Sequence, residues 1–134
     1  MSYTMQKSAG GEFDAVVETT IESLEGEEFG VLCDIDVQQT LEKKLNEDFR
    51  RYRILGACNP ALAHRSLQEE IELGALLPCN VIVYEDNDGG VTVSAVDPEQ
   101  LVGIADNSAL DSVAEEVHER FERVLDAVEA AARD

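Results

Sequence analysis

The residues best suited to chemistry gather in one stretch of the chain. The run from Ile54 to Val83, ILGACNPALAHRSLQEEIELGALLPCNVIV, contains two of the three cysteines, one of the two histidines and two of the three prolines. Thiolates are nucleophiles and ligands for soft metals, and a nearby imidazole can accept the thiol proton. The spacing matches no phosphate-binding loop, nucleophile elbow or HExxH zinc motif, so the stretch bounds the function without naming it.

Cys58 occupies the position with the clearest chemical consequence. Asn59 followed by Pro60 is typical of a helix start, because the Asn side chain accepts a hydrogen bond from a free amide and Pro has no amide to lose. The amides and dipole at this helix start favour a thiolate over a thiol at Cys58. The alternative is that Cys58 and Cys79 are small core residues at strand ends, since cysteine is often buried.

The candidate thiol site consists of Cys58, His64 and Cys79, where His64 orients or deprotonates Cys58. Two sulfurs and an imidazole also suit zinc or copper. If the helix after Pro60 connects parallel strands, however, Cys58 and Cys79 lie at opposite ends of the sheet, about 20 Å apart. We therefore expect no metal site unless the topology differs, and a packing or capping role for His64 remains open.

A second candidate site binds an anion. Four of the seven arginines, Arg50, Arg51, Arg53 and Arg65, lie within sixteen residues. In this site Arg53 and Arg65 supply positive charge, while Asn59 and the helix amides donate hydrogen bonds to a small anionic ligand. The alternative is that the arginines neutralise carboxylates across a subunit interface.

The hydrophobic pattern predicts the elements that position these residues. We expect an N-terminal segment, residues 1–12, with an edge strand, and a single α+β domain over residues 13–134. The order is β-α-β-α-β-α-β-β-α, with one sheet covered by helices. The predicted helices are Phe13 to Gly26, Val37 to Leu45, a helix that begins at Pro60 and is stopped by Pro78, and Ala109 to about Ala132. The predicted strands are Ser2 to Lys7, Phe29 to Ile35, Arg51 to Cys58, Cys79 to Tyr84 and Val91 to Val96.

Two details of this pattern bear on the cysteines and the last helix. Val31, Cys33 and Ile35 alternate along one strand, which predicts that Cys33 is a core residue. The segment from Glu99 to Asn107 is expected to connect the hairpin to the last helix. That helix carries an apolar stripe that covers the sheet or pairs with its copy in a dimer.

The sequence also resembles a known family. DFRRYRILGACNPALAHRSL with the later LLPCNVIVYED is similar to the uncharacterised domain-of-unknown-function-302 family, in element order from about Phe13 to Pro98. The resemblance implies a compact α+β domain that pairs as a homodimer, with no agreed activity, and Arg51 departs from it where proline is expected. The motif positions are Phe49, Arg50, Tyr52, Arg53, Gly56, Cys58, Asn59, Pro60, Ala63, Leu77, Pro78, Cys79 and Asn80.

Charge and composition indicate where the protein works. The 134 residues include 29 acidic and 10 basic ones, which gives a formal net charge of −19. Concentrated salt screens such self-repulsion, since the Debye length is about 3 Å at 1 M, so we expect a halophilic, salt-adapted cytoplasm. The charge argues against nucleic-acid and membrane binding. Three cysteines without close pairing favour reduced thiols.

Three functions remain open from the sequence. The first is a non-enzymatic, homodimeric module that binds a small anionic ligand near the Asn59–Pro60 helix start. The second is a thiol-dependent redox or soft-metal-handling protein that uses Cys58. The third is a structural protein whose exposed helix face binds another protein. No cofactor follows from these residues, and whether the protein is an enzyme stays undecided.

Overall fold

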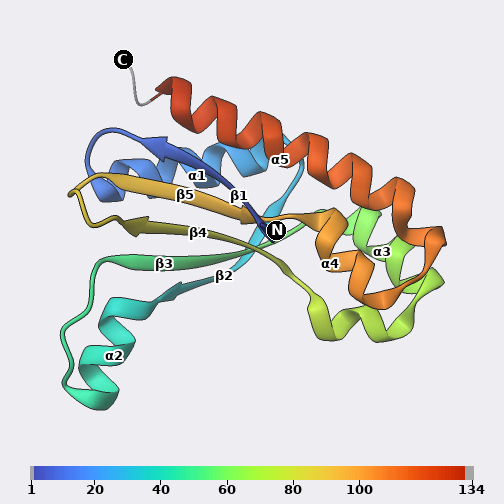
Figure 1. The fold of residues 1–134 in the computed structure, drawn as a ribbon, viewed down its shortest axis with the longest axis horizontal. Helices are drawn as coiled ribbons and strands as arrows, with labels where there is room; N and C mark the ends of the chain where they lie inside the picture. Colours follow the sequence, from blue (N-terminus) through green and yellow to red (C-terminus); the bar gives the residue numbers. More distant parts are fainter. Residues whose placement is uncertain (1, 132–134) are drawn as a thin grey trace.

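Alternating apolar residues form five strands that join into one antiparallel sheet (Figure 1). The protein is represented by a computed structural model that describes residues 2–131. The sheet order is β1-β5-β4-β3-β2. The strands are β1 Thr4–Ala9, β2 Gly30–Asp36, β3 Tyr52–Cys58, β4 Cys79–Glu85 and β5 Val91–Val96.

The helices follow the predicted order, with additions near the end of the chain. The α+β fold class, the single sheet and the alternation of strands and helices are confirmed. The helices are α1 Phe13–Gly26, α2 Val37–Leu45, α3 Pro60–Glu69, α4 Pro98–Ala105 and α5 Asp111–Ala131, together with the 3-10 helices η1 Ile71–Leu76 and η2 Ser108–Leu110.

The hydrophobic core lies between one face of the sheet and the helices α1 and α5. The apolar stripe of α5 is buried as its periodicity predicts, so this helix covers the sheet. Phe121 from α5 is fully buried, and its ring centroid lies 4.9 Å from that of Phe29. This contact joins the middle of α5 to the residue that precedes β2.

Helix α4 was not predicted. Asp97 accepts a hydrogen bond from the Glu99 amide and Pro98 occupies the first turn, which is the same start signal that Asn59 and Pro60 give to α3. The sequence predicts only a connection over Glu99 to Asn107. The segment after Pro98 is therefore a short helix that packs against α5 rather than a plain connection.

Helix α3 is shorter than predicted. It ends at Glu69, and the chain continues as η1 before Pro78. Within η1, Ile71 is 77% exposed, whereas Leu73 is buried. The tighter winding of the 3-10 helix shifts which side chains face the core.

The prediction that Cys33 is a core residue was wrong, because β2 contains a β-bulge. The register pairs Val31 with Ala57 but Cys33 with Gly56, so Leu32 is the extra residue. Val31 stays on the core side, while Cys33 and Ile35 move to the opposite face, where both are exposed. The simple alternation of apolar residues gave no sign of the bulge.

Gly56 permits a close approach on this second face of the sheet. A Cβ atom at this position would lie 2.6 Å from Cys33 Sγ and 2.8 Å from Pro78 Cγ. Both distances are well below the contact distance of about 3.5 Å that nonbonded carbon atoms prefer. Because Gly56 has no side chain, Cys33 of β2 and Pro78, which precedes β4, can both pack against the backbone of β3.

We predict that Gly56→Ala lowers the free energy of unfolding by about 1–3 kcal/mol, because the new methyl group overpacks this contact. Urea denaturation measures the change. Gly30→Ala is the matched control, since the nearest atom to its Cβ is the Cys58 carbonyl oxygen at 3.9 Å. Equal stability of the two variants would contradict the close-contact explanation.

Among residues 2–131, no helix combines the length and apolar character needed to cross a membrane.

Candidate functional site

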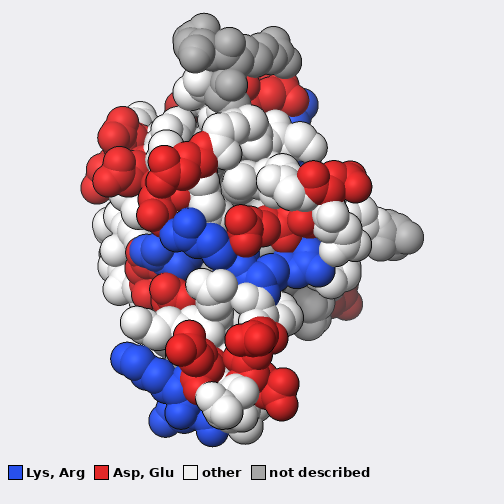
Figure 2. Space-filling view, turned by 90° about the vertical axis from the view of Figure 1, so that its left-hand side faces the viewer, with Lys and Arg blue, Asp and Glu red and all other residues white. Residues whose placement is uncertain are grey.

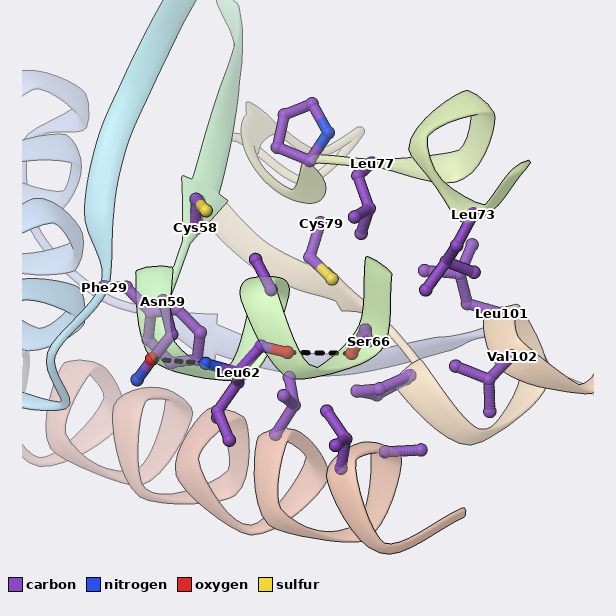
Figure 3. A pocket seen from close by; sticks show the side chains of 17 residues that line it. Phe29, Cys58, Asn59, Leu62, Ser66, Leu73, Leu77, Cys79, Leu101 and Val102 are labelled. Carbon is purple, nitrogen blue, oxygen red and sulfur yellow. Dashed lines mark hydrogen bonds between the residues drawn. The ribbon is translucent and has the colours of Figure 1, made fainter. Parts of the chain in front are cut away.

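The candidate site is an apolar pocket at the end of the sheet where β3 finishes and β4 begins (Figure 3). The cavity has a volume of ≈ 60 Å³. Its walls come from α3, η1, α4 and α5, and its lining includes Leu62, Leu73, Leu101, Val102, Val113 and Val117. No charged side chain is among the described lining residues, so the pocket favours an uncharged, apolar occupant.

Cys58 and Cys79 both line this pocket, which corrects the expectation that they lie about 20 Å apart if their strands are parallel. The strands β3 and β4 are antiparallel, and Ala57 pairs directly with Cys79. The last residue of β3 and the first residue of β4 therefore lie at the same end of the sheet. The connecting segment with α3 and η1 is not a parallel crossover.

Apolar side chains surround the Cys79 thiol in the pocket. Burial, and to a smaller extent charge repulsion from Cys58, together raise the pKa of this thiol from 9.0 to about 11. The Cys79 side chain projects from the start of β4 towards α3 (Figure 3). At neutral pH Cys79 is therefore a protonated, apolar part of the wall and a poor nucleophile.

Two polar side chains in the pocket wall form hydrogen bonds with the backbone of α3. Asn59 Oδ1 accepts a hydrogen bond from the Leu62 amide at 3.2 Å, which confirms Asn59 as the N-cap. Ser66 Oγ donates to the Leu62 carbonyl oxygen at 2.8 Å. Both residues are buried, so they stabilise the helix that forms one wall.

The structure does not bring the predicted anion-binding residues together. Arg53 precedes Asn59 by six residues of extended chain, a span of about 20 Å, and its guanidinium binds the Asp34 carboxylate on β2. Arg65 is exposed on α3, and its Nη1 lies 4.0 Å from Glu116 Oε1. Of the three residues, Asn59 alone lines the pocket.

His64 is also outside the pocket. It is exposed on α3, and the described lining does not include it. The structure therefore groups Cys58 with Cys79 from the candidate thiol site, and it places the imidazole on the helix surface.

The other arginines of the cluster pair with neighbouring groups of the same chain. Arg51 contacts Asp14 at 2.5 Å and stacks over the Phe13 ring, with its guanidinium carbon 4.6 Å from the ring centroid. Arg50 donates to Asn87 Oδ1 at 2.8 Å. At this end of the molecule the Lys and Arg side chains are bordered by Asp and Glu side chains (Figure 2).

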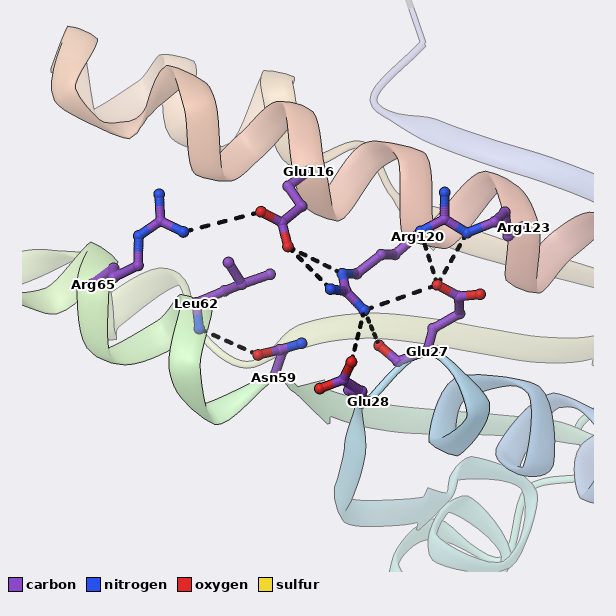
Figure 4. A network of polar contacts seen from close by, with 8 residues as sticks. All are labelled: Glu27, Glu28, Asn59, Leu62, Arg65, Glu116, Arg120 and Arg123. Carbon is purple, nitrogen blue, oxygen red and sulfur yellow. Dashed lines mark hydrogen bonds and ion pairs between the residues drawn. The ribbon is translucent and has the colours of Figure 1, made fainter.

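A separate charged network holds the helices around the pocket (Figure 4). Arg120 on α5 donates to the Glu27 carbonyl oxygen at 2.8 Å, at the C-terminal end of α1, and contacts Glu116 at 3.1 Å. Arg123 adds a contact to Glu27 at 2.9 Å, and Arg65 extends the network to α3. The network therefore connects α1, α5 and α3.

Most of the pocket lining was not predictable from the sequence. The contributions of α4 and η1 depend on a helix that was not predicted and on the shortening of α3. The Asp97–Pro98 pair was the available signal for α4. Nothing local in the sequence indicates that Leu101 and Val102 would face Cys79 across a cavity.

The raised pKa of Cys79 predicts a specific loss of stability in alkali. The folded protein retains a proton that the unfolded chain releases, so this contribution is present below pH 9.0 and is lost as the pH rises through about 11. The expected loss is about 2–3 kcal/mol in the free energy of unfolding. Urea denaturation across this range measures it.

Cys79→Ala removes the titrating group, so its stability should fall less steeply with pH than that of the unmodified protein. Cys33→Ala is the matched control, because Cys33 is exposed. Identical pH profiles for the unmodified protein and Cys79→Ala would show that Cys79 is not held as a buried thiol.

Comparisons with known proteins agree with the fold and give no activity. The family model described as "Domain of unknown function DUF302" matches residues 3–128. A crystal structure of an uncharacterized conserved protein DUF302 from Bacillus stearothermophilus is similar to this chain, with 32% sequence identity and a TM-score of 0.89. The match covers 96% of this chain and 99% of the other. No curated protein matches this chain.

Proposed function

The chain belongs to the uncharacterised domain-of-unknown-function-302 family, and from that starting point we propose that it is a non-enzymatic, homodimeric module that binds a small ligand beside the start of α3. The observation that carries the proposal is the apolar pocket at the shared end of β3 and β4. Apolar pockets with a few polar groups are the usual form of small-ligand sites.

The lining favours an uncharged ligand with only a few non-hydrogen atoms. The cavity volume is ≈ 60 Å³, and the described lining consists almost entirely of apolar side chains. An ion would lose its hydration in such a place without gaining an opposite charge. The polar groups of Asn59 and Ser66 already bond to α3, so shape and apolar contact would dominate recognition.

The anionic ligand expected from the sequence has less support from this geometry. Arg65 is the nearest of the predicted cations along α3, and it already faces Glu116. The first helical turn is also partly satisfied, because the Asn59 side chain caps the Leu62 amide. An anion would therefore have to displace Glu116 from Arg65 and bind at the mouth of the pocket rather than inside it.

Titrations followed by amide chemical shifts distinguish these two ligand classes. We expect dichloromethane, an uncharged probe with three non-hydrogen atoms, to shift the amides of pocket residues such as Leu62 and Val117. Inorganic phosphate tests the anionic version, and it should act on the first turn of α3 and lose its effect in Arg65→Ala.

A filled-pocket variant provides the control for the dichloromethane titration. Ala63→Leu adds bulk to a lining residue, and it should abolish the dichloromethane shifts. Ala61→Leu makes the same change on the exposed side of α3 and should leave them intact. Shifts that survive Ala63→Leu, or the absence of any response to either probe, would overturn the proposed binding site.

The face of the sheet opposite α1 and α5 supports the homodimer. The register places Ile35, Ile54 and Ile82 side by side on this face, and the Tyr52 and Tyr84 rings stack beside them at 5.6 Å. Ile35 is 44% exposed. A partly exposed apolar sheet face of this kind is typical of an association surface.

Helix α2 adds to this support, because none of its residues is buried. A helix of nine residues is marginal without packing against other elements. Sedimentation velocity tests the proposed dimer: Ile35→Asp should weaken association, while Ile104→Asp, a change on the exposed side of α4, should not. A monomer at every concentration would remove the dimer from the proposal.

The second candidate function is thiol-dependent, and one specific observation favours it. Cys58 and Cys79 share a pocket, which the antiparallel pairing of their strands makes possible. The exposed position of His64 removes the imidazole from this group, so a thiol function would depend on the two cysteines and the start of α3.

A further inference from the structure

The two edges of the sheet differ in how they are protected from pairing with another chain. The outer strands are β1 and β2. Strand β2 carries the bulge at Leu32 and the charged side chains of Asp34 and Asp36, which are features that guard a sheet edge. Strand β1 has neither a bulge nor a proline, and its register with β5 is continuous from Thr4 to Ala9. The β1 edge therefore has room for a further strand.

Alternate residues of β1 direct their backbone groups away from the sheet. The Tyr3 carbonyl oxygen accepts a hydrogen bond at 2.9 Å from the amide of the residue after β5. Because bonding directions alternate along an antiparallel strand, the backbone groups of Thr4, Gln6 and Ser8 point to the open edge. Ser2 Oγ bonds the Thr4 amide at 3.2 Å and the Thr4 carbonyl oxygen at 2.8 Å. Among the described strands, none pairs with the outward groups of Gln6 and Ser8.

Helix α5 forms an acidic groove along this edge. The described lining of the groove includes Met5 and Lys7 from β1, and Glu122 and Asp126 from α5. Lys7 is the only lysine or arginine in that lining, and its Nζ lies 3.7 Å from Asp126 Oδ1 and 3.9 Å from Glu129 Oε1. These carboxylates outnumber the Lys7 ammonium, so the groove favours basic side chains on whatever binds beside it.

A second copy of this chain suits the edge less well than a basic segment does. Antiparallel pairing of β1 with its own copy would place both α5 helices on the same face of the joined sheet. The Glu122 and Asp126 carboxylates of the two chains would then face each other, and each chain carries a formal net charge of −19. A partner with lysine or arginine at alternate positions replaces this repulsion with attraction.

We propose that the β1 edge binds an extended, basic segment of another protein as a sixth strand, antiparallel to β1. The backbone groups of Gln6 and Ser8 bond to the segment, which is the usual way that a peptide is added to a sheet edge. Segment residues opposite Gln6 and Ser8 lie on the face away from α5. The residues between them direct basic side chains into the groove, towards Glu122. This surface is separate from the apolar pocket and from the sheet face proposed for the dimer.

Peptides of equal charge distinguish strand pairing from simple electrostatic attraction. The probe is the capped peptide VKVKVKV, and amide chemical shifts of the full chain report its binding. N-methylation of the valines removes the peptide amides that would face Gln6 and Ser8, so it should abolish binding. N-methylation of the lysines changes only the amides that point away from β1, so this matched control should still bind. Equal binding of the two methylated peptides would show that charge alone attracts them and would overturn the proposal.

Substitutions in the chain locate the bound peptide. Gln6→Pro should weaken binding of VKVKVKV about tenfold, because it removes an outward amide and leaves the bonds to β5 in place. Glu122→Gln should weaken it about threefold, as expected for an exposed ion pair. Glu115→Gln is the matched control, since Glu115 lies on the side of α5 that faces α4, and it should leave binding unchanged. Unchanged binding to folded Gln6→Pro would contradict the proposed pairing.

Hydrogen exchange of the unmodified protein guards against variants that fail to fold. In the free protein the amides of Gln6 and Ser8 should exchange faster than those of Met5 and Lys7, which bond to β5. Saturating VKVKVKV should slow the exchange of Gln6 and Ser8. The absence of this protection would overturn the proposal. Protection that rises with protein concentration without peptide would also overturn it, because a second copy would then occupy the edge.

Discussion

The antiparallel pairing of β3 with β4 is the constraint on which the site depends. This pairing places Ala57 opposite Cys79, so the chain leaves β3 and enters β4 at the same end of the sheet. The connecting residues then have no need to cross the sheet. They fold into α3 and η1 beside the strand ends, where α4 and α5 complete the walls of the pocket.

The arrangement of helices explains how one small domain has both a core and a surface for association. Helices α1 and α5 bury the core-facing side chains of the sheet, including Leu55, Val81 and Val93. The β-bulge at Leu32 then turns Cys33 and Ile35 to the opposite face, which the core does not use. Arg120 ties the two covering helices together at the end near the pocket.

Local chemistry in the sequence predicted the starts of elements well. The Asn59–Pro60 pair placed the start of α3 correctly, and the period of the last helix predicted its buried stripe. Strand direction was beyond such reasoning, because it depends on where the connecting segment packs in three dimensions. The bulge at Leu32 could not be predicted, because Val31, Cys33 and Ile35 still alternate in the sequence. The pocket could not be predicted either, because it combines elements that are distant in sequence.

The central claim is that the pocket at the shared strand ends is preformed and apolar. A crystal structure of the protein under xenon pressure tests it most directly, because xenon enters dry apolar cavities without needing a specific contact. The account predicts xenon between α3 and α5, in contact with Leu62 and Val117. Xenon bound elsewhere in the protein, with none in this pocket, would contradict it.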